Sequence, residues 1–482
     1  MNREKNDIGI IGLAAMGSNL AMNFADHGFR TAIFNRSLQR TQALVAAYGN
    51  GRNIDPVYTI EALVASLASP RKILLMVQSG ESVDHVINSL LPLLAPGDIV
   101  IDGGNSFFKD TVRREAALQG SGIHFVGLGV SGGEEGARRG PALMFGGSEV
   151  AWKSLQPLLE AIAAVDYSGR PCVARLGEGG AGHYVKMVHN GIEYADMELI
   201  AESAFLLKHL FGHSNLLIAD RLEEWNRGRL ESFLIEISAK IFRTRERDGS
   251  FIIDAILDTA GSKGTGKWTA EESLELGEPA FSLATAVFAR YASSCKERRL
   301  LLSRVHKDTG EARAMDEGGV AETDIEATLY AGKLLSYAQG YDLLGKASAA
   351  YGWDLDFAEI SRIWQGGCII RARFLAEMER LFKETGKEAD VLLSPWAQEI
   401  LARDTQALRT VSSQAILKGL PVPGILSAIS YFDSMRTEVL PANLIQAQRD
   451  FFGAHTFQRE INGPSEHFTW QEREENDPIH LQ

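Results

Sequence analysis

From residue 7 to about residue 180, short apolar runs alternate with longer amphipathic stretches. The runs are rich in β-branched residues and Leu, and the stretches between them repeat their apolar residues every three to four positions. Parallel strands that are buried on both faces have such apolar runs, and crossover helices have apolar residues at every third or fourth position. We therefore predict parallel strands at residues 7–12, 31–34, 72–77, 99–102 and 124–129, with 142–145 and 172–176 as further candidate strands.

The pattern changes after the glycine-rich residues 179–182. Beyond them, long segments have the 3.6-residue period of a helix, and Leu, Ala, Ile, Glu and Arg dominate. The second half is therefore predicted to be nearly all helical. From about residue 438 the chain carries Pro441 and the Gly463-Pro464 pair, which predict one more helix followed by an irregular tail.

One predicted helix of the second half carries polar residues where an apolar stripe is expected. Lys186, His189, Asn190 and Glu193 are spaced i, i+3, i+4 and i+7, so they share one face. A solvated surface would give the same spacing. Glycines near the helix start and flanking apolar residues instead favour a helix packed closely against another part of the chain. On such a face, lysine and glutamate can serve one substrate as base and acid if burial moves their pKa values towards neutrality.

Residues 12–17, Gly-Leu-Ala-Ala-Met-Gly, follow the first predicted strand and open a helix. They fit the fingerprint of a dinucleotide-binding turn. Its small residues allow the tight turn, the approach of a pyrophosphate and the close packing of helix on strand. The phosphate would lie on the helix N-terminus. The first domain is therefore predicted to be Rossmann-like.

The end of the second predicted strand indicates which dinucleotide binds. A dehydrogenase that uses NAD presents an acidic side chain there to the ribose 2′-hydroxyl, whereas this chain has Asn35, Arg36 and Ser37. Arg36 can pair with a 2′-phosphate and stack on the adenine, and its two neighbours can donate hydrogen bonds. We predict NADP as the cofactor.

A second glycine-rich segment, residues 261–268, is similar to a P-loop. Trp268, however, stands where a Ser or Thr would have to hold magnesium, and no strand of the first domain precedes the segment. We therefore reject a kinase or NTPase. The loop still suits an anion, because it offers Lys263, Thr265 and backbone amides.

Composition and charge narrow the class of protein further. The 482 residues include 45% hydrophobic and 23% charged residues, which is typical of a globular protein, and their net charge of −13 argues against nucleic-acid or anionic-membrane binding. No secretory signal and no apolar run long enough to span a bilayer are visible, so we expect a cytoplasmic protein. Cys172, Cys295 and Cys368 lie far apart and are predicted to be reduced core residues, and no metal site is expected.

The motifs, in this order, resemble those of the 6-phosphogluconate dehydrogenase family. The resemblance runs from the first strand almost to the tail and rests on residues 12–17, 35–37, 102–106, 130–138, 182–194, 263–268 and 446–455. It implies that NADP oxidises 6-phosphogluconate, which loses carbon dioxide to give ribulose 5-phosphate. It also implies that Lys186 is the general base and that Glu193 is the general acid.

The resemblance implies binding residues and a homodimer as well. Cofactor contacts are implied at Gly12, Ala14, Ala15, Met16, Gly17, Asn35, Arg36, Ser37, Val77, Gln78 and Asn105. Substrate contacts are implied at Asn105, Ser131, Gly132, Gly133, His189, Asn190, Tyr194, Lys263, Thr265, Arg290, Arg449 and His455. The last two would come from the tail of the neighbouring subunit, so that the two subunits share their sites. Gln78 and Phe145 depart from the family pattern, where lysine and proline are common.

The expected fold is thus an α/β Rossmann-like domain at residues 1–179 and a large all-α substrate and dimerisation domain at 180–437. A C-terminal tail at 438–482 is expected to contribute to the partner subunit's site. Two other functions compete with this one. A β-hydroxyacid dehydrogenase with a smaller, unphosphorylated substrate would use the same lysine, but it would lack the helical half and Arg449. A catalytically silent NADP-binding protein would not need both Lys186 and Glu193.

Overall fold

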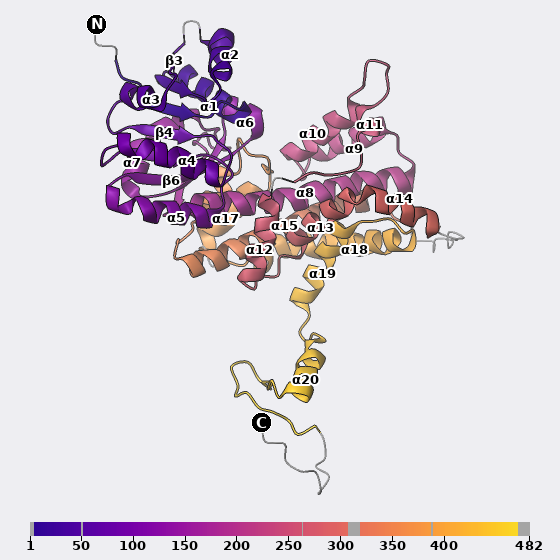
Figure 1. The fold of residues 1–482 in the computed structure, drawn as a ribbon. Helices are drawn as coiled ribbons and strands as arrows, with labels where there is room; N and C mark the ends of the chain where they lie inside the picture. The colour runs from indigo at the N-terminus through magenta and orange to yellow at the C-terminus, as the bar shows by residue number, and fades with distance from the viewer. Residues whose placement is uncertain (1–3, 50–51, 263, 307–318, 387–388, 471–482) are drawn as a thin grey trace. The chain divides into compact units, whose positions relative to one another are not determined.

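The structure is a computed structural model that describes residues 4–49, 52–262, 264–306, 319–386 and 389–470 (Figure 1). Its contacts divide the chain into two units, residues 1–429 and 430–482. The first contains a sheet and most of the helices, and the second contains the tail.

An eight-stranded sheet forms the N-terminal part, in the order β3-β2-β1-β4-β5-β6-β7-β8. All neighbours are parallel except β6 and β7. The seven predicted strands are confirmed, with ends that differ by a few residues. The prediction missed β3, a short edge strand ending in Pro56, which cannot donate a ladder hydrogen bond. The strands are β1 (Ile8–Ile11), β2 (Thr31–Phe34), β3 (Ile54–Pro56), β4 (Lys72–Leu75), β5 (Ile99–Asp102), β6 (His124–Ser131), β7 (Ala142–Gly146) and β8 (Val173–Gly177).

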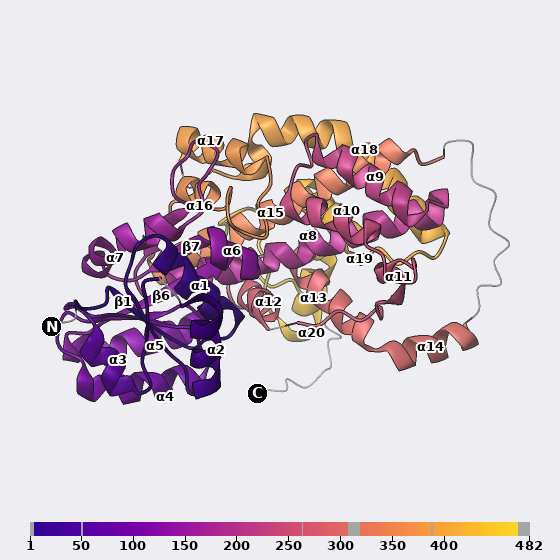
Figure 2. The same ribbon diagram turned by 90° about the horizontal axis from the view of Figure 1, so that it is seen from above.

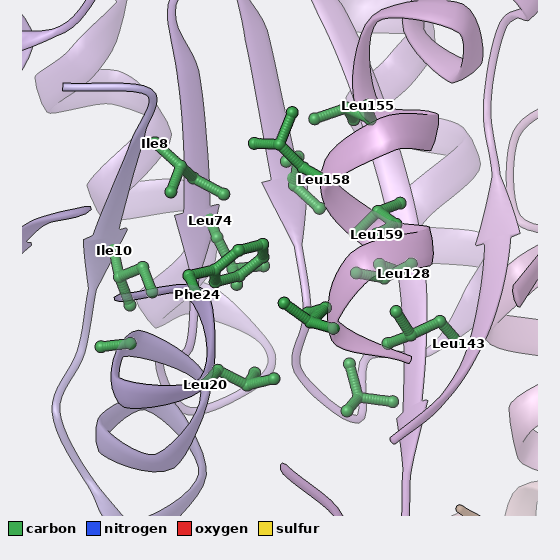
Figure 3. Packing of buried hydrophobic residues seen from close by; sticks show 14 of the residues in the cluster. Ile8, Ile10, Leu20, Phe24, Leu74, Leu128, Leu143, Leu155, Leu158 and Leu159 are labelled. Atoms are coloured by element: carbon green, nitrogen blue, oxygen red, sulfur yellow. The ribbon is translucent and has the colours of Figure 1, made fainter. Parts of the chain in front are cut away.

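Helices bury both faces of the sheet, as the apolar runs predicted. Ile8 and Ile10 of β1 pack in one core with side chains of α1 and α7 (Figure 3). Ile11 of the same strand belongs to a second core with side chains of α3, α4 and α5. Successive residues of a strand thus fill opposite cores. The helices are α1 (Ala15–Asp26), α2 (Leu38–Tyr48), α3 (Ile60–Ser66), α4 (Glu81–Leu90), α5 (Phe108–Leu118), α6 (Gly133–Arg139) and α7 (Glu149–Ile162).

Two long helices, α8 (Ala181–Phe211) and α15 (Glu322–Tyr351), pack against each other in the helical half (Figure 2). Lys333 of α15 donates to both carboxylate oxygens of Asp196 of α8, at 2.5 and 2.6 Å, and the pair is fully buried. Such a pair fixes the alignment of the two helices, because shifting either one would leave a buried charge unpaired. The other helices of this half are α9 (Asn215–Asn226), α10 (Phe233–Arg243), α11 (Ile252–Ala255), α12 (Thr265–Glu275), α13 (Phe281–Ser294), α14 (Lys296–Val305), α16 (Phe357–Ile363), α17 (Leu375–Thr385) and α18 (Pro395–Leu417).

The first turn of α8 packs directly on the sheet. A Cβ added at Gly182 would lie 2.4 Å from the carbonyl oxygen of Gly127 in β6 and 2.3 Å from that of Met144 in β7. Only glycine permits this approach, and it is the close packing that the sequence predicted for this helix. One helix is therefore packed on the sheet at its start and on α15 further along, so the sheet and the helical half form one unit.

The tail unit contains the end of α19 (Pro423–Arg436) and the whole of α20 (Ala442–Gly453). Beyond α20, the chain as far as residue 470 is irregular except for an isolated bridge between Phe457 and Glu466. A last helix followed by irregular chain is the arrangement that the sequence predicted. Across the described ranges, no helix combines the length and the apolar character needed to cross a membrane.

Candidate active site

The polar face of α8 is a connected group of side chains. The Lys186 Nζ donates to the Oδ1 of Asn190 at 2.7 Å and lies 3.3 Å from the Nδ1 of His189. The same His189 nitrogen lies 3.7 Å from a carboxylate oxygen of Glu193. Lys186, His189 and Asn190 are at most 7% exposed, and the Glu193 side chain is 21% exposed. The shared face is confirmed, and the alternative of a solvated surface is wrong.

Burial sets the ionisation of this group. It lowers the pKa of Lys186, and the negative charge of Glu193 opposes that shift. It also lowers the pKa of His189 well below its usual value, with the Lys186 cation adding to the effect. His189 is therefore neutral near pH 7 and has one donor and one acceptor nitrogen. A lysine with a lowered pKa has a larger neutral fraction, as a base requires.

The end of β6 forms one wall beside this face. The Oγ of Ser131 lies 3.0 Å from the Nε2 of His189. Gly129 packs on Lys186, because an added Cβ there would come within 2.6 Å of the Lys186 Cβ. The predicted substrate residues Gly132 and Gly133 follow with φ values of 120° and 63°, which favour glycine. The need for Gly129 was missed, because a contact between distant segments leaves no local signal in the sequence.

Helices α12 and α13 meet the same helix one turn further along. The ring of Tyr194 leaves room only for glycine at position 266, where a Cβ would come within 2.5 Å of it. The guanidinium carbon of Arg290 lies 3.4 Å from the centre of the same Tyr194 ring, which is a cation–π arrangement. Thr265 is buried at the start of α12. The structure thus brings Tyr194, Arg290 and the start of α12 together, whereas Lys263 lies outside the described residues.

The glycine-rich turn after β1 has the predicted tight geometry. Gly12 has a φ of 101°, and a Cβ there would lie 2.5 Å from the carbonyl oxygen of Met76. A Cβ at Gly17 would lie 1.9 Å from the carbonyl oxygen of Gly12. The Asn35 side chain accepts a hydrogen bond from the Leu13 N–H at 2.9 Å, which ties the turn to the end of β2. The strand order reverses between β1 and β4, and dinucleotides bind at such a switch point.

The other predicted cofactor residues follow the carboxyl ends of four neighbouring strands, β2, β1, β4 and β5. Because these strands are parallel, their ends meet at one edge of the sheet. Val77 and Met16 are partly buried. The remaining side chains are exposed, namely Ala14, Ala15, Arg36, Ser37, Gln78 and Asn105.

Asp102 supports the candidate site, although it was not among the predicted contacts. Its fully buried carboxylate accepts the Gly104 N–H at 3.0 Å and the Ser106 hydroxyl at 2.6 Å. The guanidinium of Arg114 lies 3.4 Å from it. These bonds shape the loop that carries Asn105. An acidic residue followed by two glycines and a serine is the local signal that could have revealed this turn.

Arg449 and His455 lie in the tail unit, and both are exposed. Arg449 donates to the side-chain oxygen of Gln446 at 3.0 Å. The His455 ring lies 5.9 Å from that of Phe452, measured between centroids. The two basic side chains are thus six residues apart in the sequence, one on α20 and one just after it, and both are exposed.

The cysteines correct one prediction. Cys172 and Cys368 are buried, but Cys295 is exposed where α13 ends and α14 begins, so it is not a core residue. Burial raises the pKa of Cys172 and of Cys368 to about 12, which makes both thiols unreactive. Among the residues that the structure describes, no group of three or more His, Cys, Asp and Glu side chains could hold a metal ion.

A mostly parallel sheet has a glycine turn at its switch point and is joined to a helical half that presents a buried lysine. This combination defines a dinucleotide-dependent dehydrogenase fold. Comparisons with known proteins agree. The profile of the NAD binding domain of 6-phosphogluconate dehydrogenase matches residues 7–177, and that of the enzyme's C-terminal domain matches residues 182–470. The chain therefore belongs to the 6-phosphogluconate dehydrogenase family.

Individual relatives match over nearly their whole length. A decarboxylating 6-phosphogluconate dehydrogenase of Klebsiella pneumoniae is 48% identical over 97% of this chain and 100% of its own. One from Escherichia coli (strain K12) is 48% identical over 94% of this chain and 97% of its own. The solved Plasmodium falciparum 6-phosphogluconate dehydrogenase is 37% identical, with a TM-score of 0.92 over 96% of this chain and 100% of its own. The match includes the helical half that a smaller β-hydroxyacid dehydrogenase would lack.

Proposed function

We propose that this protein converts 6-phosphogluconate to ribulose 5-phosphate and carbon dioxide with reduction of NADP, a step of the pentose phosphate pathway. The observation that carries the proposal is the buried Lys186, which contacts His189 and Asn190 on the same face of α8 as Glu193. It occurs in a chain that is 48% identical to enzymes of this name. The Plasmodium falciparum relative is described with NADP+ and with 6-phosphogluconate. The free cysteines fit a reducing compartment, so we place the reaction in the cytoplasm.

The turn after β1 fits NADP. A Cβ at Gly12 or Gly17 would collide with backbone atoms, so the two glycines let the turn pack closely against the neighbouring backbone. The N-terminus of α1 is then left open for a pyrophosphate. When bound, NADP accepts the hydride removed from the substrate. The pyrophosphate would contact Gly12, Ala14, Ala15, Met16 and Gly17. The 2′-phosphate would contact Asn35, Arg36 and Ser37, and the nicotinamide half would lie near Val77, Gln78 and Asn105.

Lys186 acts first, as the base. Its neutral amine takes the proton of the 3-hydroxyl, which the lowered pKa makes possible. The resulting ammonium polarises the new carbonyl and stabilises the enolate left when carbon dioxide departs. Asn190 fixes the direction of the amine through the 2.7 Å hydrogen bond. Neutral His189, held by Ser131, offers a hydrogen bond to the sugar acid without adding a second positive charge.

Glu193 acts last, as the acid that protonates the enediol. Its carboxyl group is on the face that holds Lys186 and is partly exposed, so it can take up from solvent, before this last step, the proton that it donates. Substrate hydroxyls would be bound by Asn105, Ser131, Gly132, Gly133, His189 and Asn190. The two roles need both groups on one rigid element, which the single helix α8 provides.

The substrate phosphate needs a cluster of donors and positive charge. Tyr194, Thr265 and Arg290 supply part of it in one subunit, with Lys263 in the same segment. Arg449 and His455 would complete it from the tail of a second copy. This arrangement makes the protein a homodimer with shared sites, in which residues 1–179 bind the cofactor and 180–437 bind the substrate and the partner. Residues 438–482 then serve the partner subunit.

One assay tests the proposed reaction. Purified protein is given NADP and 6-phosphogluconate, and NADPH and carbon dioxide are followed together. Equal amounts of both products are expected. NADPH without carbon dioxide would disprove the decarboxylation, and binding of NADP with neither product would indicate a catalytically silent protein.

Replacing Arg36 by Asp is expected to raise the KM for NADP by about tenfold or more, because the side chain loses a charge-assisted bond to the 2′-phosphate and repels it. The exposed guanidinium makes the change easy to accommodate. The ratio of kcat/KM for NADP to that for NAD measures the effect, and the KM for 6-phosphogluconate at saturating cofactor is the control. An unchanged ratio would show that the 2′-phosphate lies elsewhere.

A further inference from the structure

Asp450 occupies an unusual place in the tail. It is the only buried residue of α20, and no other described residue from 437 to 470 is buried. The large apolar side chains around it face outward instead. Phe451 is 55% exposed, Phe452 is 73% exposed and Ile461 is 94% exposed. The tail is thus organised around a carboxylate instead of an apolar core.

Four donors converge on this carboxylate. Its Oδ1 accepts the Thr456 N–H at 2.9 Å and lies 2.9 Å from the Nδ1 of His467. Its Oδ2 accepts the Phe468 N–H at 3.0 Å and the indole N–H of Trp470 at 2.8 Å. Burial opposes the charge, but these donors hold the pKa of Asp450 well below its usual range. Asp450 is therefore ionised at neutral pH, and it joins α20 to the following turn and to the chain near residue 470.

The hydrogen bonds also fix the two basic residues of the tail. Arg449 directly precedes Asp450 on α20, and His455 directly precedes Thr456, whose N–H is held by the carboxylate. The turn between them passes through Ala454, which has a φ of 50°, a conformation that is costly for alanine. The bond to Thr456 compensates for that cost and sets the spacing of Arg449 and His455.

We propose that Asp450 is a positioning residue that folds the tail into a preformed module, so that Arg449 and His455 reach the phosphate of a substrate bound to a second copy of this chain. This inference rests on the proposed function, because it needs the tail to act in the partner's site. A preformed module loses less conformational freedom on binding than a flexible segment would. The outward apolar side chains are then free to contact the second copy.

Replacing Asp450 by Asn tests the inference. In the variant, an amide NH2 group faces donors that a carboxylate oxygen accepts in the unchanged protein. The KM for 6-phosphogluconate should therefore rise by about tenfold or more, because hydrogen bonds to a charged group are lost. The kcat and the KM for NADP should stay within about twofold. Glu460→Gln removes the same charge from an exposed position in the tail and should leave all three constants unchanged. Trp470→Phe removes a single donor and should raise the KM by a smaller factor.

Two further measurements separate positioning from general damage. The double variant Asp450→Asn with Arg449→Met should raise the KM by less than the product of the two single effects, because Arg449 is one of the two contacts that Asp450 positions. Mixed dimers of Asp450→Asn with an excess of Lys186→Met should recover the normal KM, since each working Lys186 then receives an intact tail. Additive losses, an Asp450→Asn variant that matches Glu460→Gln, or a KM that mixing does not restore would each overturn the inference. A wild-type protein inactive on 6-phosphogluconate would instead overturn the proposed function.

Discussion

Replacing Lys186 by methionine is expected to lower the turnover of 6-phosphogluconate by about a thousandfold or more. Methionine has a similar length and fits a position that is only 7% exposed, but it can neither take the hydroxyl proton nor stabilise the enolate. The affinity for NADP should stay within about twofold, since Lys186 is not among the expected cofactor contacts. NADPH absorbance gives the rate, and quenching of protein fluorescence by NADP gives the dissociation constant.

The matched control for this variant is Lys208→Met. Lys208 lies on the same helix, in its last turn, and its side chain is 49% exposed. The same change of charge and shape should therefore leave the turnover unaltered. A thousandfold loss in both variants would indicate damage to α8, and a large loss of NADP binding in Lys186→Met would count against Lys186 as the base.

The sheet was predictable because its strands are buried on both faces and read as short apolar runs. The missed strand, β3, is an edge strand of three residues with intermediate burial, and Pro56 weakens the strand signal further. The antiparallel pairing of β6 and β7 was also not foreseen. Strand direction depends on how the chain turns between them through the short helix α6, and apolar patterns carry no information about that.

The candidate site was predictable where its residues share one helix. Lys186, His189 and Asn190 could be placed on one face from their spacing alone, and their burial followed from the glycines at the helix start. Contacts between distant segments were not accessible in this way. Gly129 touches Lys186 from another element, and nothing in the residues around it signals that approach.

Asn35 shows a different limit of sequence reasoning. Its position at the end of β2 predicted a donor to the 2′-phosphate, and that role stays a prediction. In the structure its side-chain oxygen accepts from Leu13, and its amide nitrogen donates to the Ser37 carbonyl at 3.2 Å. A residue type and a position can indicate a binding role, but only the neighbours show which of its hydrogen-bonding groups are already used.

Replacing Glu193 by glutamine is expected to slow overall turnover by about a hundredfold, because the amide keeps the shape of the side chain but cannot donate an acidic proton to the enediol. Hydride removal depends on Lys186 and precedes this step. Stopped-flow mixing should therefore show a rapid burst of NADPH close to one per site, followed by slow steady turnover, whereas the wild-type enzyme should show no such burst if protonation is fast.

The pH dependence of the first turnover distinguishes this role from a general disturbance of the site. The Glu193 charge opposes the lowering of the pKa of Lys186 by burial, so removing that charge should lower this pKa further. A base is active only when neutral, and the loss of the NADPH burst on acidification should therefore shift to lower pH in Glu193→Gln. A burst that is itself slowed a hundredfold, or an acid limb that moves to higher pH, would show that Glu193 does not act as the acid beside Lys186.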